Sequence, residues 1–239
     1  MKELFTEKAY RRLYQANRFI MEQSYKEAAK YLILPAREGI PEAMTNMGTL
    51  RFKGLGLQKD TKKAVYWYKL AAKKGCKTAL YNLSICYRIG YGTEINSEKA
   101  LVLLFTAAKL GLVSAQYQLG KMSYYGESME QSTVKAIFWY KKAADAGHKQ
   151  AQLALAELFR LEQPNVEIQQ DLIKAHLYAN LALHNGSPEA RDLLELIEGN
   201  MVGRQRDVAK RLYVKWGKNY ERGYGYSCHK MQSSLSVNH

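Results

Sequence analysis

The sequence has few of the residues that interrupt helices and few that cross-link small folds. Its 239 residues include four prolines, and few runs are β-rich, so helix is the expected secondary structure. The three cysteines, Cys76, Cys86 and Cys228, lack the spacing of metal ligands, and their odd number argues against a disulfide framework. The composition therefore favours a helical protein from a reducing compartment.

Long apolar runs are also missing. The first residues, MKELFTEKAYRRLYQ, contain no apolar core of the kind found in a signal peptide. No uninterrupted apolar run approaches the roughly 20 residues that span a bilayer. We therefore expect a soluble cytoplasmic protein without a transmembrane segment.

Negative charge is scarce relative to positive charge. The 36 Lys and Arg residues exceed the 22 Asp and Glu residues, which gives a net charge of +14. Residues 43–78 carry nine basic residues and one acidic residue, Asp60, and residues 200–239 carry eight and two. Residues 151–199 instead carry three basic and eight acidic residues. Separated charge favours electrostatic steering of an acidic partner, and the alternative is a solvated surface that keeps the protein soluble.

What the sequence does contain is an internal repeat. A glycine recurs after steps of 36, 36, 36 and 39 residues, with an alanine eleven residues before and four residues after each one. A candidate helix N-cap stands fifteen residues before each glycine. The four registers are Gly39, Gly75, Gly111, Gly147 and Gly186; Ala28, Ala64, Ala100, Ala136 and Ala175; Ala43, Ala79, Ala115, Ala151 and Ala190; and Ser24, Asp60, Asn96, Ser132 and Asp171.

Each repeat is interpreted as a helix, a glycine-containing turn and a capped second helix that ends at glycine. A lone hairpin cannot bury its apolar face, so the hairpins are expected to stack. Small residues recur where helices approach closely, and large ones fill the space between: Gly48, Ser84, Gly120 and Ala156; Trp67, Leu103, Trp139 and Tyr178. The turn KGLGLQKD, residues 53–60, lacks the spacing of a phosphate loop and recurs as IGYGTEIN at 89–96, so we interpret it as a repeat turn.

Three segments carry a more specific motif: MGTLRFKGLGLQKDTKKAVYWYKLAAKKG, LSICYRIGYGTEINSEKALVLLFTAAKLG and LGKMSYYGESMEQSTVKAIFWYKKAADAG. They resemble the Sel1-like repeat family, a relative of the tetratricopeptide repeat. The resemblance implies an all-α, right-handed α-solenoid of stacked antiparallel hairpins. We expect a degenerate N-terminal repeat or cap at 1–42, repeats at 43–78, 79–114, 115–150 and 151–189 (the last with an atypical turn), capping helices at 190–223 and a flexible tail at 224–239.

The resemblance also implies a non-enzymatic scaffold or adaptor that binds a peptide or folded protein in its concave groove, without a cofactor. Members of the family act in bacterial signalling, envelope biogenesis, host interaction and toxin immunity. The groove positions carried over from tetratricopeptide-like units are Thr45, Thr49, Phe52, Tyr81, Ile85, Arg88, Tyr117, Lys121, Tyr124, Leu153, Glu157 and Arg160. Their aromatic and cationic character suits binding hot spots, although the tyrosines could instead pack between units.

A second hypothesis is binding of nucleic acid or an anionic membrane through basic faces at 51–77 and 204–222. Both segments interleave aromatic residues with Lys and Arg, which suits phosphate contact and base stacking. The basic residues are Lys62, Lys63, Lys73, Lys74, Arg204, Arg206, Lys210, Arg211 and Lys215. Against this hypothesis, the aromatics of the first segment occupy core positions of the repeat, and no nucleic-acid-reading module is present.

Little in the sequence points to catalysis. His176, Asn180 and His184 share one helical face and could hold a metal, but no third ligand stands nearby, so surface polar residues are the alternative and no metal is expected. Cys228 beside His229 has no partner motif, and Cys86 fits a small buried apolar residue. An enzyme is not expected.

Overall fold

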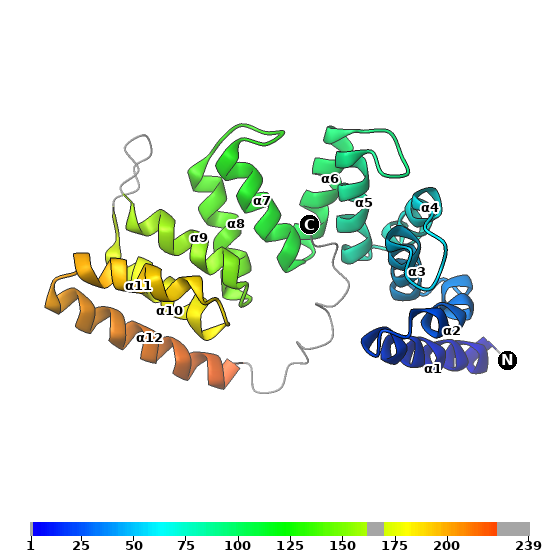
Figure 1. Cartoon of the computed structure of the whole chain (residues 1–239), viewed down its shortest axis with the longest axis horizontal. Coiled ribbons are helices and arrows are strands. Elements are labelled where there is room, and N and C mark those ends of the chain that lie inside the picture. The colour runs from blue at the N-terminus through cyan, green and yellow to red at the C-terminus, as the bar shows by residue number, and fades with distance from the viewer. Residues whose placement is uncertain (1, 162–169, 224–239) are drawn as a thin grey trace. The chain divides into compact units, whose positions relative to one another are not determined.

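The computed structural model describes residues 2–161 and 170–223, with side chains described for 7–161 and 170–216. These residues form twelve helices and no strand, so the all-α prediction is confirmed (Figure 1). The helices are α1 (Lys2–Met21), α2 (Tyr25–Arg37), α3 (Pro41–Lys53), α4 (Thr61–Lys73), α5 (Lys77–Ile89), α6 (Ser97–Lys109), α7 (Val113–Tyr125), α8 (Thr133–Asp145), α9 (Lys149–Arg160), α10 (Leu172–His184), α11 (Glu189–Asn200) and α12 (Gly203–Gly223).

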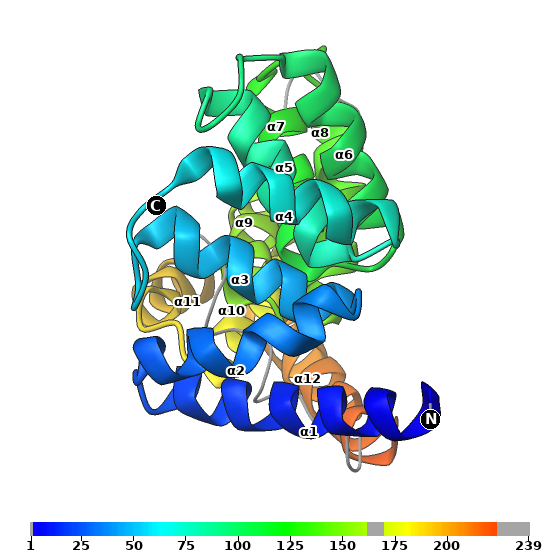
Figure 2. The ribbon, with the colours of Figure 1, turned by 90° about the vertical axis from the view of Figure 1, so that its right-hand side faces the viewer.

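The described chain divides into two compact units. The N-terminal unit ends at Leu112 and holds α1 to α6, and the C-terminal unit begins at Val113 and holds α7 to α12. In the N-terminal unit, α1–α2, α3–α4 and α5–α6 form hairpins that stack in order (Figure 2). In the C-terminal unit, the hairpins α7–α8 and α9–α10 are followed by α11 and α12, which both pack on α10. Hairpins stacked in this way make an α-solenoid, as predicted.

The second helix of four hairpins begins with a side-chain cap, as the sequence predicted. Asp60, Asn96, Ser132 and Asp171 each accept a hydrogen bond from the backbone N–H three residues ahead. Ser24 does not, so the prediction is wrong there. Asp60, Asn96 and Ser132 have extended backbones, and Asp171 is close to them with a φ of −131° and a ψ of 84°. Ser24 has a φ of −81° and a ψ of 59° after a tight turn, and this conformation moves its hydroxyl away from the first turn.

The glycines that end the second helices adopt the left-handed conformation that the sequence predicted. Their φ values lie between 77° and 83° at Gly39, Gly75, Gly111, Gly147 and Gly186. A side chain in this conformation is strained, so glycine is the residue that ends each hairpin at lowest cost.

In the hairpins α3–α4 and α7–α8 a glycine of the first helix lies under a tyrosine ring of the second. A Cβ atom on Gly48 would lie 2.7 Å from Cε1 of Tyr68, and one on Gly120 would lie 2.4 Å from Cδ1 of Tyr140. Tyr68 has no exposed surface, and its hydroxyl hydrogen-bonds that of Thr49 at 3.1 Å. The predicted close approach is therefore present, but the facing rings lie one position after the tryptophans that the sequence suggested.

Two predictions remain, that of no transmembrane segment and those for the fourth repeat turn and the tail. Within residues 2–161 and 170–223, every helix is too short or too polar to cross a bilayer. The tail at 224–239, with Cys228 and His229, lies outside the described residues, as does 162–169 of the turn in the fourth predicted repeat.

Candidate interaction surface

The predicted groove positions of α3 and α5 are mostly buried. Thr45, Thr49, Phe52 and Ile85 are at most 7% exposed. The Thr45 hydroxyl donates to the Pro41 carbonyl oxygen at 2.7 Å, and Thr49 bonds Tyr68. This face of α3 packs against α4 and the start of α5, and Ile85 belongs to the same core cluster as Phe52. The prediction that these four residues line an accessible groove is therefore wrong.

Two predicted positions of the N-terminal unit remain accessible. Tyr81 is half-buried and Arg88, two turns later on α5, is exposed. Burial raises the pKa of the Tyr81 phenol, and the positive charge of Arg88 opposes that rise, which indicates that the two groups are close. They make a small aromatic and cationic surface.

The predicted positions of the C-terminal unit stay together and are accessible. On α7, Tyr117, Lys121 and Tyr124 are half-buried, and on α9 Glu157 is exposed while Arg160 is half-buried. The Arg160 guanidinium donates two hydrogen bonds, of 2.9 and 2.8 Å, to one carboxylate oxygen of Glu157. These five residues, with the half-buried Leu153, form what we call the α7–α9 face.

His148 supports this face and was not predicted. Its ring stacks on Tyr117 with centroids 4.4 Å apart, and its Nδ1 accepts a hydrogen bond from the Ala151 N–H, which caps α9. Burial lowers the pKa of His148 to about 4, so the ring is neutral near pH 7. Histidine is not a favoured cap, and Cys76 and Leu112 occupy the same repeat position, so little in the sequence points to this role of His148.

The side chains of His176, Asn180 and His184 do not meet at a common metal-binding position. His176 is 3% exposed, and its Nε2 lies 2.9 Å from a carboxylate oxygen of Glu198 on α11. The Asn180 amide donates to His176 Nδ1 and to the His176 carbonyl oxygen, so Nε2 carries the proton. His184 is exposed beside Trp216. His176 is thus a buried, hydrogen-bonded residue rather than a surface one, and the described side chains include no group of three potential metal ligands.

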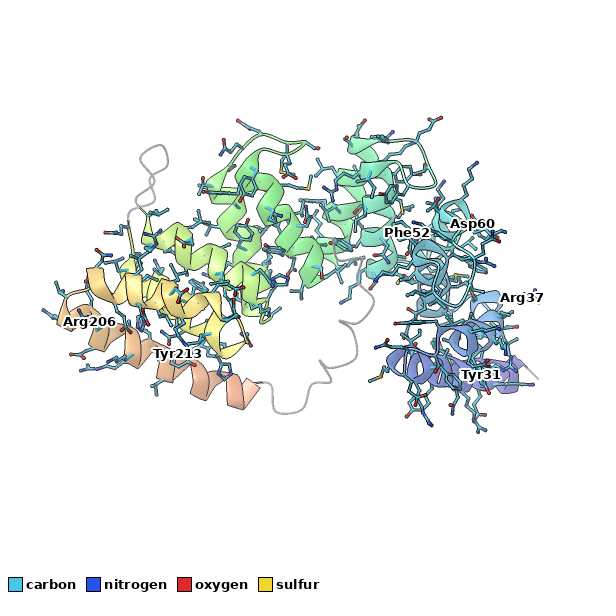
Figure 3. The ribbon with its side chains drawn as sticks, viewed as in Figure 1. Tyr31, Arg37, Phe52, Asp60, Arg206 and Tyr213 are labelled. Carbon is cyan, nitrogen blue, oxygen red and sulfur yellow. The ribbon has the colours of Figure 1, made fainter. Side chains whose placement is uncertain are left out.

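The two predicted basic faces differ in their aromatic residues. Lys62, Lys63, Lys73 and Lys74 are exposed, and so is Tyr66 of α4. The predicted basic residues at the start and middle of α12 are exposed as well: Arg204, Arg206, Lys210, Arg211 and Lys215. Tyr213 and Trp216 of α12, however, are half-buried against the core of the C-terminal unit, with Tyr213, labelled in Figure 3, stacked on Trp216. They are therefore poorly placed to stack on bases.

Comparison with known proteins identifies the repeat. A model of the Sel1 repeat matches the chain at 41–76, 77–112 and 113–148, each frame beginning two residues earlier than the sequence suggested. No curated protein matches the chain.

Several solved structures share the fold. A Sel1 repeat protein from Oxalobacter formigenes superposes with a TM-score of 0.72 and 22% identity, over 89% of this chain and 91% of that one. The protective antigen c5321, present in uropathogenic Escherichia coli strains, gives 0.64 and 22%, over 83% of this chain and 42% of that one. Immunity protein Pa5087 from Pseudomonas aeruginosa gives 0.52 and 20%, over 87% and 81%. With three consecutive Sel1 repeats and this fold, the chain is a Sel1-like repeat protein.

Proposed function

We propose that the chain is a non-enzymatic scaffold that binds a peptide or folded protein, and that the α7–α9 face is a contact surface. Sel1-like repeat proteins are typically scaffolds of this kind. The observation that carries the proposal is that Tyr117, Lys121, Tyr124, Glu157 and Arg160 remain accessible on neighbouring helices of one unit. Tyrosine and arginine are the residue types that dominate binding energy at protein interfaces.

The α7–α9 face is also ordered before any partner binds. The ring of Tyr117 is held by His148, and the guanidinium of Arg160 is held by Glu157. A side chain that is already fixed loses less rotamer entropy on binding, so more of its contact energy contributes to affinity. This supports binding by a pre-formed surface.

The charge distribution supports an acidic partner. The chain carries a net charge of +14, and its basic residues concentrate at 43–78 and 200–239. Long-range attraction of this kind speeds association with a negatively charged protein. The fold is also found in proteins described as immunity proteins, which favours a protein ligand.

Affinity capture tests the proposal. The full chain is used as bait in nuclease-treated lysate at physiological salt, and bound proteins are identified by mass spectrometry. We expect a stoichiometric protein that is lost with Tyr124→Ala/Arg160→Ala and kept with Lys135→Ala/Lys141→Ala, a control on the exposed side of α8. A partner that both variants retain would remove the α7–α9 face from the proposal.

A second candidate function is binding of nucleic acid or an anionic membrane through the basic faces at 51–77 and 204–222. It is favoured by the exposed cations of α4 and α12, and weakened by the packing of Tyr213 and Trp216 against the protein core. Anisotropy of a labelled random oligonucleotide tests it, since phosphate binding weakens steeply with salt. Binding at physiological salt that disappears with Arg204→Ala/Arg211→Ala/Lys215→Ala would favour this candidate.

A further inference from the structure

The exposed side of α4 carries a stripe of lysines interrupted by a tyrosine. Lys62, Tyr66, Lys69 and Lys73 recur at i, i+4, i+7 and i+11, and all four are exposed. Tyr66 is 57% exposed, and its ring is braced edge-on by Trp67 at 5.5 Å. Among the described residues, Lys63 pairs with Asp60 at 3.1 Å, whereas the lysines of the stripe have no carboxylate partner.

A related stripe, without the tyrosine, occurs on α2, thirty-six residues earlier. Lys26, Lys30, Ile33 and Arg37 occupy the equivalent positions and are exposed; Arg37, labelled in Figure 3, is the last residue of its helix. Lys30 pairs with Glu27 at 2.8 Å. On both helices the first and last of the four positions are cations, and the two positions between them vary.

The segments that flank α2 and α4 approach each other, which places the two stripes on consecutive second helices of one unit. A Cβ atom on Gly39, just beyond α2, would lie 3.1 Å from Nζ of Lys74, just beyond α4. At the other end, a Cβ atom on Gly56, in the turn before α4, would lie 2.3 Å from the backbone of Tyr25 at the start of α2. The Lys74 side chain thus approaches the turn after α2, and the turn before α4 approaches the start of α2.

The cations of this surface are not a general property of the fold. In α8 the equivalent positions hold Val134, Phe138, Lys141 and Asp145, which combine exposed apolar side chains with charges of both signs. An exposed helix that serves only solubility is expected to show such a mixture. The α2 and α4 stripes instead carry six cations and no acid, and among the described ion pairs only Lys30 of these cations contacts a carboxylate, that of Glu27.

We propose that the exposed stripes of α2 and α4 are a docking surface for an acidic helix of a protein partner. This inference rests on the proposed scaffold function and assigns its acidic partner to the outer side of the second helices. Lys62 and Lys73 are separated by about 16 Å along the axis, at about 1.5 Å per residue. A partner helix with carboxylates at i, i+7 and i+11 matches the lysines, and an apolar side chain at i+4 meets Tyr66.

Lysine chemistry favours this partner over nucleic acid. The ammonium group is a compact point charge that suits single carboxylates, whereas the planar guanidinium of arginine suits bidentate contact with phosphates and stacking on bases. The α4 stripe contains lysine and no arginine, and the α2 stripe contains one arginine. One exposed tyrosine also provides little area for stacking on successive bases.

Fluorescence anisotropy with the full chain tests the inference. The probe is a labelled, alanine-based helical peptide with glutamates at i, i+7 and i+11 and leucine at i+4. At physiological salt, Lys62→Ala/Lys69→Ala/Lys73→Ala should weaken binding about tenfold, as expected for three exposed ion pairs. Tyr66→Ala should weaken it about threefold with no change in net charge. The matched control, Lys135→Ala/Lys141→Ala/Lys142→Ala on α8, should change it less than about twofold.

Other outcomes would overturn the inference. An equal loss in the α4 and α8 variants would show general charge attraction instead of a site. Displacement of the peptide by a random oligonucleotide or by phosphatidylserine vesicles at lower concentration would replace the acidic helix with a phosphate ligand. Loss of peptide binding in Tyr124→Ala/Arg160→Ala but not in the α4 variant would reject the stripes and leave the proposed scaffold function intact.

Discussion

Gly120 of α7 cannot be replaced by a larger residue without a clash with the Tyr140 ring of α8. The 2.4 Å separation between a Cβ atom there and Cδ1 of Tyr140 is far below a van der Waals contact. In the α5–α6 hairpin the corresponding positions hold Ser84 and Leu104, both buried, so a larger residue on one helix accompanies a smaller one on the other. In these two hairpins the sizes of the paired residues compensate each other, so glycine is required only where a tyrosine faces it.

Gly120→Ala should destabilise the protein by about 1–3 kcal/mol through overpacking, although alanine is the better helix former. In a Tyr140→Leu background the same substitution should become neutral or stabilising, because the clash is gone. Urea denaturation followed by circular dichroism measures both effects.

Gly199 is the matched control. It lies in α11 with no atom within 4 Å of a Cβ, so Gly199→Ala should stabilise by up to about 1 kcal/mol. If Gly120→Ala has the same sign in both backgrounds, the tyrosine is not the cause of the constraint.

His148 should make stability depend on pH. Its pKa falls from the ordinary 6.5 to about 4 on folding because burial disfavours the charged ring. The unfolded chain binds the proton first, so this contribution is complete above pH 6.5 and is lost as pH falls to about 4, up to on the order of 3 kcal/mol. His148→Asn retains a capping side chain and should show a smaller loss of stability between pH 6.5 and 4. Parallel stability curves for the two proteins would contradict this assignment.

At the scale of the helix, capping distinguishes hairpins that look equivalent in sequence. Asn96→Ala should cost about 1 kcal/mol, because its side chain accepts the Lys99 N–H at 2.8 Å. Ser24→Ala should change stability by less than about 0.5 kcal/mol, since its hydroxyl makes no such bond. Thermal melts of the two variants provide the comparison. Equal losses would mean that Ser24 caps α2 in solution.

The helices, their glycine stops and most of their caps could be predicted from sequence because they depend on local chemistry repeated in register. Burial of the faces could not, because it depends on tertiary packing between hairpins. Thr49 and Glu157 occupy the same repeat position, yet one is buried against Tyr68 and the other is exposed. Likewise, His148 occupies the repeat position of Cys76, and its role depends on the stacking of its ring on Tyr117, which is a tertiary contact.

At the scale of the whole chain, each unit has buried cores of its own. In the C-terminal unit, Tyr140, Leu155 and Ile197 belong to one continuous cluster. We therefore expect a fragment of residues 113–223 to fold cooperatively, with the helix content of the described structure and a sharp thermal transition by circular dichroism. A fragment of residues 149–223, which loses α7 and α8, should melt broadly. A broad transition in the longer fragment would show that its core requires residues before Val113.

The facing pairs of small and large residues also limit how such a chain can be rearranged by recombination. Joining α5 to α8 within a turn would set Ser84 beneath Tyr140, and the reciprocal product would leave a void between Gly120 and Leu104. Exchange at the junctions between hairpins preserves every pair. The hairpin, and not the single helix, is thus the segment that duplication and exchange can copy without repair.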